Sequence, residues 1–298
     1  MDVVGSSAAQ IPNAIEAGRR RWISAEQADA IRQIDHFRYS EYQHLDLDAL
    51  VEEYMQNFVF PLLALRGAPR SVADIGAGYG WLAFAFALGT DAEVTMMEYD
   101  AKRSQAAQQI AAILGVEHRI RWLVGSIAAI PLRDREIDAV YCVEVIEHTG
   151  VEASYVAELC RISNDVLVIT TPNKVFPIIK HDTVLPFCHW LPLGARNVYA
   201  GLFGRRNLQQ NNLFWSPRQL LGAVNGFERR SRFLQFADYA TYLAAQGGRA
   251  NGAGWFARLQ GIYFAAAART GRLSIFLLPN LASTFRRKIP AGIPDAPA

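Results

Sequence analysis

Short apolar runs alternate with longer amphipathic segments between residues 68 and 173, and this alternation dominates the pattern of the chain. Five runs have the length and continuous hydrophobicity of strands buried on both faces of a parallel sheet. They lie at 72–75, 93–97, 120–124, 138–142 and 166–170. Three segments with helical spacing lie between them, at 79–88, 101–114 and 151–161. The alternation predicts a doubly wound α/β sheet with helices crossing between parallel strands.

The first apolar run ends in a glycine-rich turn that reads Val72-Ala-Asp-Ile-Gly-Ala-Gly-Tyr-Gly80. Its glycines let the backbone turn sharply and approach a ligand, and the next helix offers free backbone N–H groups. The dinucleotide fingerprint G-x-G-x-x-G requires a third glycine at position 81, which is Trp81 here. The turn therefore favours a nucleotide-like ligand and argues against a nicotinamide dehydrogenase.

Polar residues end or follow the later runs. Glu98 ends the second run, about 20 residues beyond the glycine turn, where a carboxylate can bind ribose hydroxyls. The alternative for Glu98 is an ordinary exposed acid at a strand end. Ser126 follows the third run, Cys142 ends the fourth, and Thr171-Pro-Asn173 follows the fifth.

This succession resembles the class I S-adenosylmethionine (SAM) methyltransferase family over about a hundred residues. The resemblance implies a seven-stranded Rossmann-like sheet whose last strand is antiparallel. It also implies a cofactor site in which Ser126 stands where the family commonly has an acid that binds adenine, leaving backbone groups and Ile127 to hold the ring. The expected cofactor-binding residues are Asp74, Gly76, Gly78 and Gly80 at the methionine end, Glu98 at the ribose, Ser126 and Ile127 at the adenine, and Cys142 beneath the ligand.

Outside this core we expect an N-terminal tail and helical cap over residues 1–66. Ser24 and Gln27 form a capping box that begins one of its helices, and Pro61 interrupts another near its end. Residues 67–298 then form the SAM-binding methyltransferase domain, with a sixth strand at 227–236 and a last strand at 274–285.

An aromatic lid is expected as an insertion at residues 174–216. It contains Phe187, Trp190, Leu191, Leu193, Tyr199, Leu202 and Phe203. We expect it to line a pocket for an aromatic or lipid-like acceptor, or to lie on a membrane with Arg196, Arg205 and Arg206 at the headgroups. The alternative is a second small core packed on the N-terminal helices.

Composition narrows the class of protein. The net charge of +2 is too small to predict nucleic acid as an obligatory partner. The three cysteines lack metal-site spacing and indicate a reducing compartment. With no secretory pattern at the start and no apolar run of spanning length, we expect a cytoplasmic location.

A metal site is a further hypothesis. Glu144, Glu147 and His148 have the spacing that would place them on one face of a helix, and His181 follows the fifth run. The Glu-x-x-Glu-His run resembles the metal-binding motif of small-RNA 2′-O-methyltransferases and of ubiquinone-pathway O-methyltransferases. These four residues are therefore the candidate Mg²⁺ ligands, and His148 and His181 the candidate catalytic residues. The alternative is that Glu-His only caps and orients a helix.

These observations favour a SAM-dependent methyltransferase that acts on a small, largely apolar acceptor at oxygen. Methyl transfer depends mainly on positioning, and a hydroxyl acceptor gains from a nearby base. Two alternatives remain open: an RNA 2′-O-methyltransferase, which the low charge disfavours, and a non-catalytic SAM-binding regulatory protein.

Overall fold

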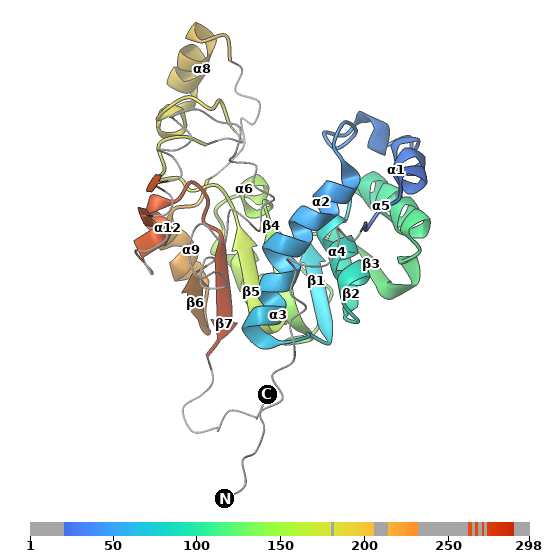
Figure 1. The fold of residues 1–298 in the computed structure, drawn as a ribbon. Helices are drawn as coiled ribbons and strands as arrows, with labels where there is room; N and C mark the ends of the chain where they lie inside the picture. Colours follow the sequence, from blue (N-terminus) through green and yellow to red (C-terminus); the bar gives the residue numbers. More distant parts are fainter. Residues whose placement is uncertain are drawn as a thin grey trace, which may run out of the picture.

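The computed structural model describes residues 21–179, 182–205, 214–231, 262–263, 266–267, 270 and 273–288. Its centre is a seven-stranded sheet in the order β3-β2-β1-β4-β5-β7-β6 (Figure 1). The strands are β1 (Ser71–Ile75), β2 (Glu93–Glu98), β3 (Ile120–Val124), β4 (Ile137–Val143), β5 (Ser163–Thr170), β6 (Phe227–Ser231) and β7 (Ser283–Arg287). Strands β1 to β5 pair in parallel, and β7 is antiparallel to both neighbours. The expected doubly wound sheet with an antiparallel last strand is confirmed.

Helices cover both faces of the sheet. One layer contains α1 (Ala25–Arg32), α2 (Leu47–Tyr54), α3 (Phe60–Arg66), α4 (Trp81–Gly89) and α5 (Ala101–Leu114), and the other contains α7 (Ala153–Ile162) and α9 (Pro217–Ala223). Successive strand residues point into opposite cores: Val72 packs with the first layer and Ala73 with the second. Two apolar cores therefore hold the carboxyl ends of β1, β2 and β4 in place.

The first N-terminal helix begins where the sequence indicates, whereas the second is not interrupted at Pro61 and its helical residues continue to Arg66. Ser24 and Gln27 form the expected capping box at the start of α1. A π-helical turn at Met55–Val59 joins α2 to α3, and Pro61 lies in the first turn of α3, where its missing N–H is tolerated. The Tyr141 hydroxyl donates to the Phe58 carbonyl, 3.2 Å away, and ties this turn to β4.

The expected strand at 274–285 is wrong over most of its length, since only its last three residues belong to β7. Residues Ser274–Leu277 form the short helix α12, and β7 begins only at Ser283. The side-chain amide of Asn173 donates to the carbonyls of Ile275 and Leu278, at 3.0 and 2.8 Å. This buried amide satisfies carbonyls at the helix end that would otherwise need strand partners.

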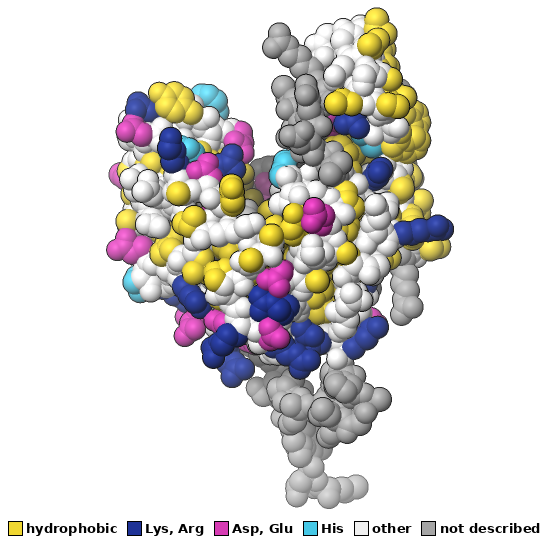
Figure 2. Space-filling model, turned by 180° about the vertical axis from the view of Figure 1, so that it is seen from behind, with side chains coloured by type: hydrophobic (Ala, Val, Ile, Leu, Met, Phe, Trp, Pro, Cys, Tyr) yellow, Lys and Arg dark blue, Asp and Glu magenta, His cyan; other side chains and the backbone are white. Residues whose placement is uncertain are grey.

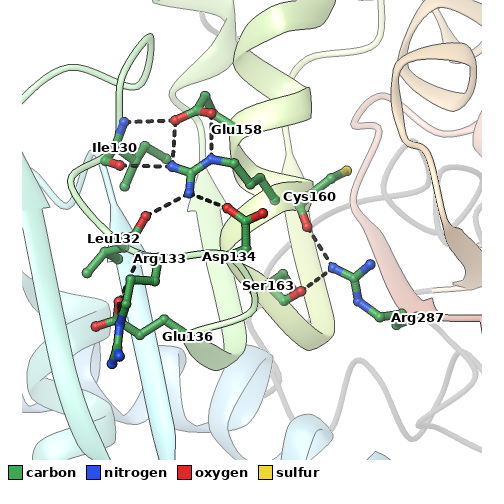
Figure 3. Close-up of polar contacts among 10 residues, drawn as sticks. Ile130, Leu132, Arg133, Asp134, Glu136, Glu158, Cys160, Ser163 and Arg287 are labelled. Carbon is green, nitrogen blue, oxygen red and sulfur yellow. Dashed lines mark hydrogen bonds and ion pairs between the residues drawn. The ribbon is translucent and has the colours of Figure 1, made fainter.

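A polar cluster joins the β3–β4 connection to α7 (Figure 3). The Arg161 guanidinium donates to the carbonyls of Ile130 and Leu132, at 2.9 and 2.7 Å, and pairs with Glu158 and Asp134. Because one side chain binds two carbonyls and two carboxylates, the connection that begins after β3 is held in a single conformation.

The aromatic lid is helical. It contains a 3₁₀ turn at Cys188–Trp190 and the helix α8 (Leu193–Leu202). Figure 1 shows α8 standing away from the sheet, beyond the edge at which α6 (Ile146–Thr149) follows β4. The lid therefore rises from the edge where the parallel strands end.

Candidate functional site

A cavity of about 960 Å³ opens at the carboxyl ends of the parallel strands. Residues after β1, β2, β3 and β4 line it on the sheet side, and residues of the N-terminal helices line it from above. Figure 2 shows the molecule hollowed between the N-terminal helices and the aromatic lid. Open α/β sheets bind ligands at this edge, so the cavity is the candidate site.

The glycine turn after β1 has a backbone that side chains rarely allow. Gly76, Gly78 and Gly80 all have positive φ, at 77°, 59° and 86°. A Cβ on Gly76 would lie 2.6 Å from Val145, and one on Gly80 would lie 2.9 Å from Phe84. A Cβ on Gly78 would meet nothing within 4 Å, and Gly78 lines the cavity. Gly76 and Gly80 are therefore required by packing, whereas Gly78 leaves space for a ligand.

Glu98 braces this turn from the end of β2. Its carboxylate accepts the Gly78 N–H at 2.7 Å and the Asp100 N–H at 2.9 Å. A carboxylate has about four lone-pair positions, so these two bonds leave capacity for ligand hydroxyls. Glu98 is buried and lines the cavity, as the ribose assignment requires.

Asp74 lies at the end of β1 with one carboxylate oxygen unpartnered among the described residues. The Ala83 backbone N–H hydrogen-bonds to the carboxylate, and Oδ2 has no hydrogen-bond partner. Burial, with a smaller contribution from the Glu98 charge, raises the pKa of Asp74 to about 7. An uncompensated buried carboxylate on a cavity wall suits a cationic group of a ligand.

The remaining predicted cofactor residues divide into two groups. Ser126 and Ile127 line the cavity, and the Ser126 hydroxyl accepts the Ala128 N–H at 3.2 Å. Gly80 and Cys142 do not border it: Gly80 begins α4, and Cys142 is fully buried in β4. The structure thus gathers six of the eight predicted residues around the cavity, and the other two support its wall from behind.

Sequence reasoning missed the aromatic wall of the cavity. Tyr42 lines it from the turn before α2, Tyr54 from the end of α2, and Tyr155 from α7. Burial raises the pKa of Tyr42 to about 12 and that of Tyr54 well above 10. Both phenols therefore stay protonated at neutral pH, and their hydroxyls can donate hydrogen bonds to an acceptor molecule.

Trp81 holds this wall in place. Its ring packs against Phe37 and Tyr42 of the N-terminal layer and against Phe84 of α4, at centroid distances of 5.9, 6.1 and 5.8 Å. Trp81, which replaces the third glycine of the dinucleotide fingerprint, thus packs the start of α4 against the N-terminal segment. Edge-to-face aromatic pairs of this kind add stability beyond the buried area.

The acidic residues after β4 do not share a helix face. Helix α6 begins only at Ile146, and Glu144 precedes it with a left-handed φ of 55°. Glu144 lines the cavity and accepts the Asn280 amide at 2.6 Å, whereas Glu147 is buried and accepts the Thr171 hydroxyl at 2.9 Å. Burial, followed by the charge of Glu144, raises the pKa of Glu147. The helical spacing assumed for the two carboxylates is wrong.

The candidate metal ligands do not converge in the part of the chain that the structure describes. His148 is exposed and lines the cavity together with Glu144, while Glu147 does not border it. Across the described ranges, no three His, Cys, Asp or Glu side chains form a group that could hold a metal ion. His181 lies outside the described residues.

Comparisons with known proteins indicate a methyltransferase domain in the parallel core. A methyltransferase domain family model matches residues 72–165. A "probable S-adenosylmethionine-dependent methyltransferase" of Mycobacterium tuberculosis is 28% identical over 180 residues, which are 58% of this chain and 62% of that protein. A protein of Mycolicibacterium smegmatis that is also named a probable S-adenosylmethionine-dependent methyltransferase is 30% identical over 142 residues. These residues are 47% of this chain and 52% of that protein. The chain thus spans less than two thirds of these relatives' length.

Among solved structures, the magnesium protoporphyrin IX methyltransferase of Synechocystis aligns with a TM-score of 0.47 and 18% identity, over 70% of this chain and 87% of that one. Because this score is below 0.5, the fold assignment rests on the strand order and the family match. Residues 72–165 therefore match a methyltransferase domain, and the chain is similar to proteins named as SAM-dependent methyltransferases.

Proposed function

We propose that this protein transfers a methyl group from SAM to an oxygen atom of a small, largely apolar acceptor. The observation that carries the proposal is that one cavity brings together the glycine turn, Glu98, the protonated tyrosines and His148. At about 960 Å³ the cavity is at the upper end of the range of small-molecule sites, which suits a cofactor with an acceptor beside it.

The residues present fit SAM. The unpartnered Oδ2 of Asp74 suits the ammonium group of its methionine part, and the space at Gly78 allows close approach of the backbone. Glu98 would accept the ribose hydroxyls, and the apolar side chain of Ile127 would pack on the adenine. When bound, SAM supplies an electrophilic methyl group on a sulfonium.

The chain's own part in the reaction is to place the acceptor and take its proton. Tyr42 and Tyr54 would orient the acceptor by donating hydrogen bonds, since both phenols keep their protons at neutral pH. His148 would accept the hydroxyl proton as the acceptor oxygen attacks in line. Glu144, held by Asn280, lies on the same cavity wall and would stabilise the resulting imidazolium.

The proposed reaction has no step that uses Mg²⁺. Glu147 is buried, accepts the Thr171 hydroxyl and does not line the cavity, so the described carboxylates do not present the oxygen-rich set that the ion requires. The distribution of charge favours a small molecule over RNA. On the face shown in Figure 2, most basic side chains gather away from the hollow and are mixed with acidic ones.

A pH dependence of SAM affinity follows from Asp74. Because its pKa is about 7 in the ligand-free protein, the carboxyl is mostly neutral at pH 5.5 and half ionised at pH 7. SAM affinity should therefore rise roughly tenfold over this range, since the ammonium group requires the ionised form. Calorimetric titration at several pH values measures the affinity for SAM. Asp74→Asn should bind SAM weakly with a nearly flat profile; an equal slope in both proteins would contradict the assignment.

Glu98→Ala should weaken SAM binding by about 1–3 kcal/mol, the usual cost of losing a charged hydrogen-bond partner. Isothermal titration calorimetry measures the change. Glu93→Ala is the matched control, because Glu93 begins the same strand and is exposed. Equal affinities of the two variants would show that Glu98 braces the turn without contacting the cofactor.

The proposed function is tested with methyl-labelled SAM, the purified full chain and separate lipid, quinone, glycan and RNA fractions. The label should appear in a small organic-soluble product, as a methyl ether that is stable to base. Label in RNA would support the 2′-O-methyltransferase alternative. SAM binding without transfer to any fraction would support a regulatory SAM-binding protein.

A further inference from the structure

The aromatic lid exposes apolar side chains that soluble proteins normally bury. We define the lid face as Phe187, Trp190, Leu193, Val198, Leu202 and Phe203. Leu202 is 78% exposed, Val198 66% and Phe203 61%. Of the ten residues of α8, only Ala200 is buried. A group of large exposed apolar residues at this density marks an interaction surface.

Hydrogen bonds fix the base of the lid beneath this face. The Trp190 indole N–H donates to the Lys174 carbonyl at 2.6 Å, and the His189 ring contacts the same oxygen at 3.0 Å. The Arg196 guanidinium donates to the His189 carbonyl at 3.1 Å. The exposed side chains are therefore presented by an ordered support, so the exposure does not result from a loosely packed loop.

The sequence of the lid and of the residues that follow it carries a net positive charge. From Thr183 to Phe227 the sequence contains four arginines and no aspartate or glutamate. Lys174 and Arg196 line an open recess beside Trp190, and Arg205 is exposed just beyond the end of α8. An excess of positive charge beside exposed Trp, Phe and Leu is typical of protein surfaces that lie on anionic lipid.

The lid rises from the sheet edge at which the cavity opens, although none of its described residues lines that cavity. Helix α8 and α6 stand at the same edge of the sheet in Figure 1, and α6 contributes His148 to the cavity. None of the described helices is long and apolar enough to cross a bilayer. Contact through the lid face would thus be peripheral, with the hollow of Figure 2 beside the lipid surface.

We infer that the lid face docks on the surface of an anionic lipid bilayer. Leu202, Phe203 and Trp190 enter the interfacial region, while Arg205 contacts the phosphates. The inference deepens the proposed function and rests on it, because docking would give the cavity access to an acceptor held in the membrane.

The test is sedimentation of the full chain with vesicles of phosphatidylcholine alone and of phosphatidylcholine mixed with phosphatidylglycerol. The protein should bind the anionic vesicles, more weakly as salt is raised, and bind the neutral vesicles poorly. Leu202→Glu should lower binding to the anionic vesicles by about tenfold or more. Val124→Glu is the matched control: Val124 is 58% exposed at the end of β3, outside the lid, and its variant should bind within about twofold of the wild type.

Two further measurements separate the outcomes. Melting temperatures show that both variants are folded, and SAM titration tests the proposed function independently of lipid. If Leu202→Glu bound the anionic vesicles as well as the wild type does, the docking surface would be wrong and the proposed function would stand. The same conclusion would follow if the wild type bound SAM and did not bind the vesicles. A wild-type dimer that Leu202→Glu converts to a monomer would also overturn the docking surface, in favour of contact between copies. Vesicle binding without SAM binding would overturn the proposed function and leave the lipid surface standing.

Discussion

Gly78→Leu is expected to abolish SAM binding while the protein stays folded. A Cβ at this position meets no protein atom within 4 Å, so the side chain would extend into the cavity that the cofactor needs. The left-handed backbone, with φ of 59°, adds a strain of about 1–2 kcal/mol. Calorimetry should detect no binding, and circular dichroism should show an unchanged fold.

Gly115→Leu provides the control for backbone strain. Gly115 caps the end of α5 with φ of 74°, and a Cβ there also meets nothing within 4 Å. It lies outside the cavity lining, so this variant should lose similar stability and keep its SAM affinity. If both variants lost binding equally, the effect at Gly78 would be one of stability, and the cavity would not be the SAM site.

His148→Ala is expected to reduce turnover by roughly 10²–10⁴-fold, the usual contribution of a general base. SAM affinity should change by less than about twofold, because the assigned cofactor contacts come from the ends of β1, β2 and β3. The measurement is the rate of methyl transfer to the acceptor found with labelled SAM, with SAM affinity determined on the same preparation.

His118→Ala is the control for this prediction. His118 is exposed in the 3₁₀ turn before β3 and does not line the cavity. Its variant should keep full turnover. If His148→Ala also kept full turnover, the base would be another group or the acceptor would need none, and His148 would be a residue that only orients α6.

The parallel core could be predicted because its signals are local. A strand buried on both faces requires a continuous apolar run, so β1 to β5 were visible in the order of residues. Asp74, Glu98 and Ser126 follow directly from that prediction, since the carboxyl ends of parallel strands meet at one edge. Gly80 and Cys142 were assigned to the ligand because they lie close in sequence to residues that line the cavity.

The aromatic wall could not be predicted in the same way. Tyr42 and Tyr54 come from the N-terminal segment, where Tyr42 packs on Trp81, and no local pattern reports a contact over such a separation. The geometry of Glu144 depends likewise on its left-handed backbone and on Asn280, which is 136 residues away in sequence. Spacing alone therefore placed Glu144 and Glu147 on one helix face, where they are not.

Calorimetric titration of the full chain with SAM, S-adenosylhomocysteine and NAD tests the central claim most directly. The claim is that the glycine turn, with Glu98 behind it, binds an adenosyl sulfonium and excludes a dinucleotide at Trp81. We expect saturable binding of SAM and S-adenosylhomocysteine with one site per chain, and no heat from NAD. Tight binding of NAD without binding of SAM would contradict the account.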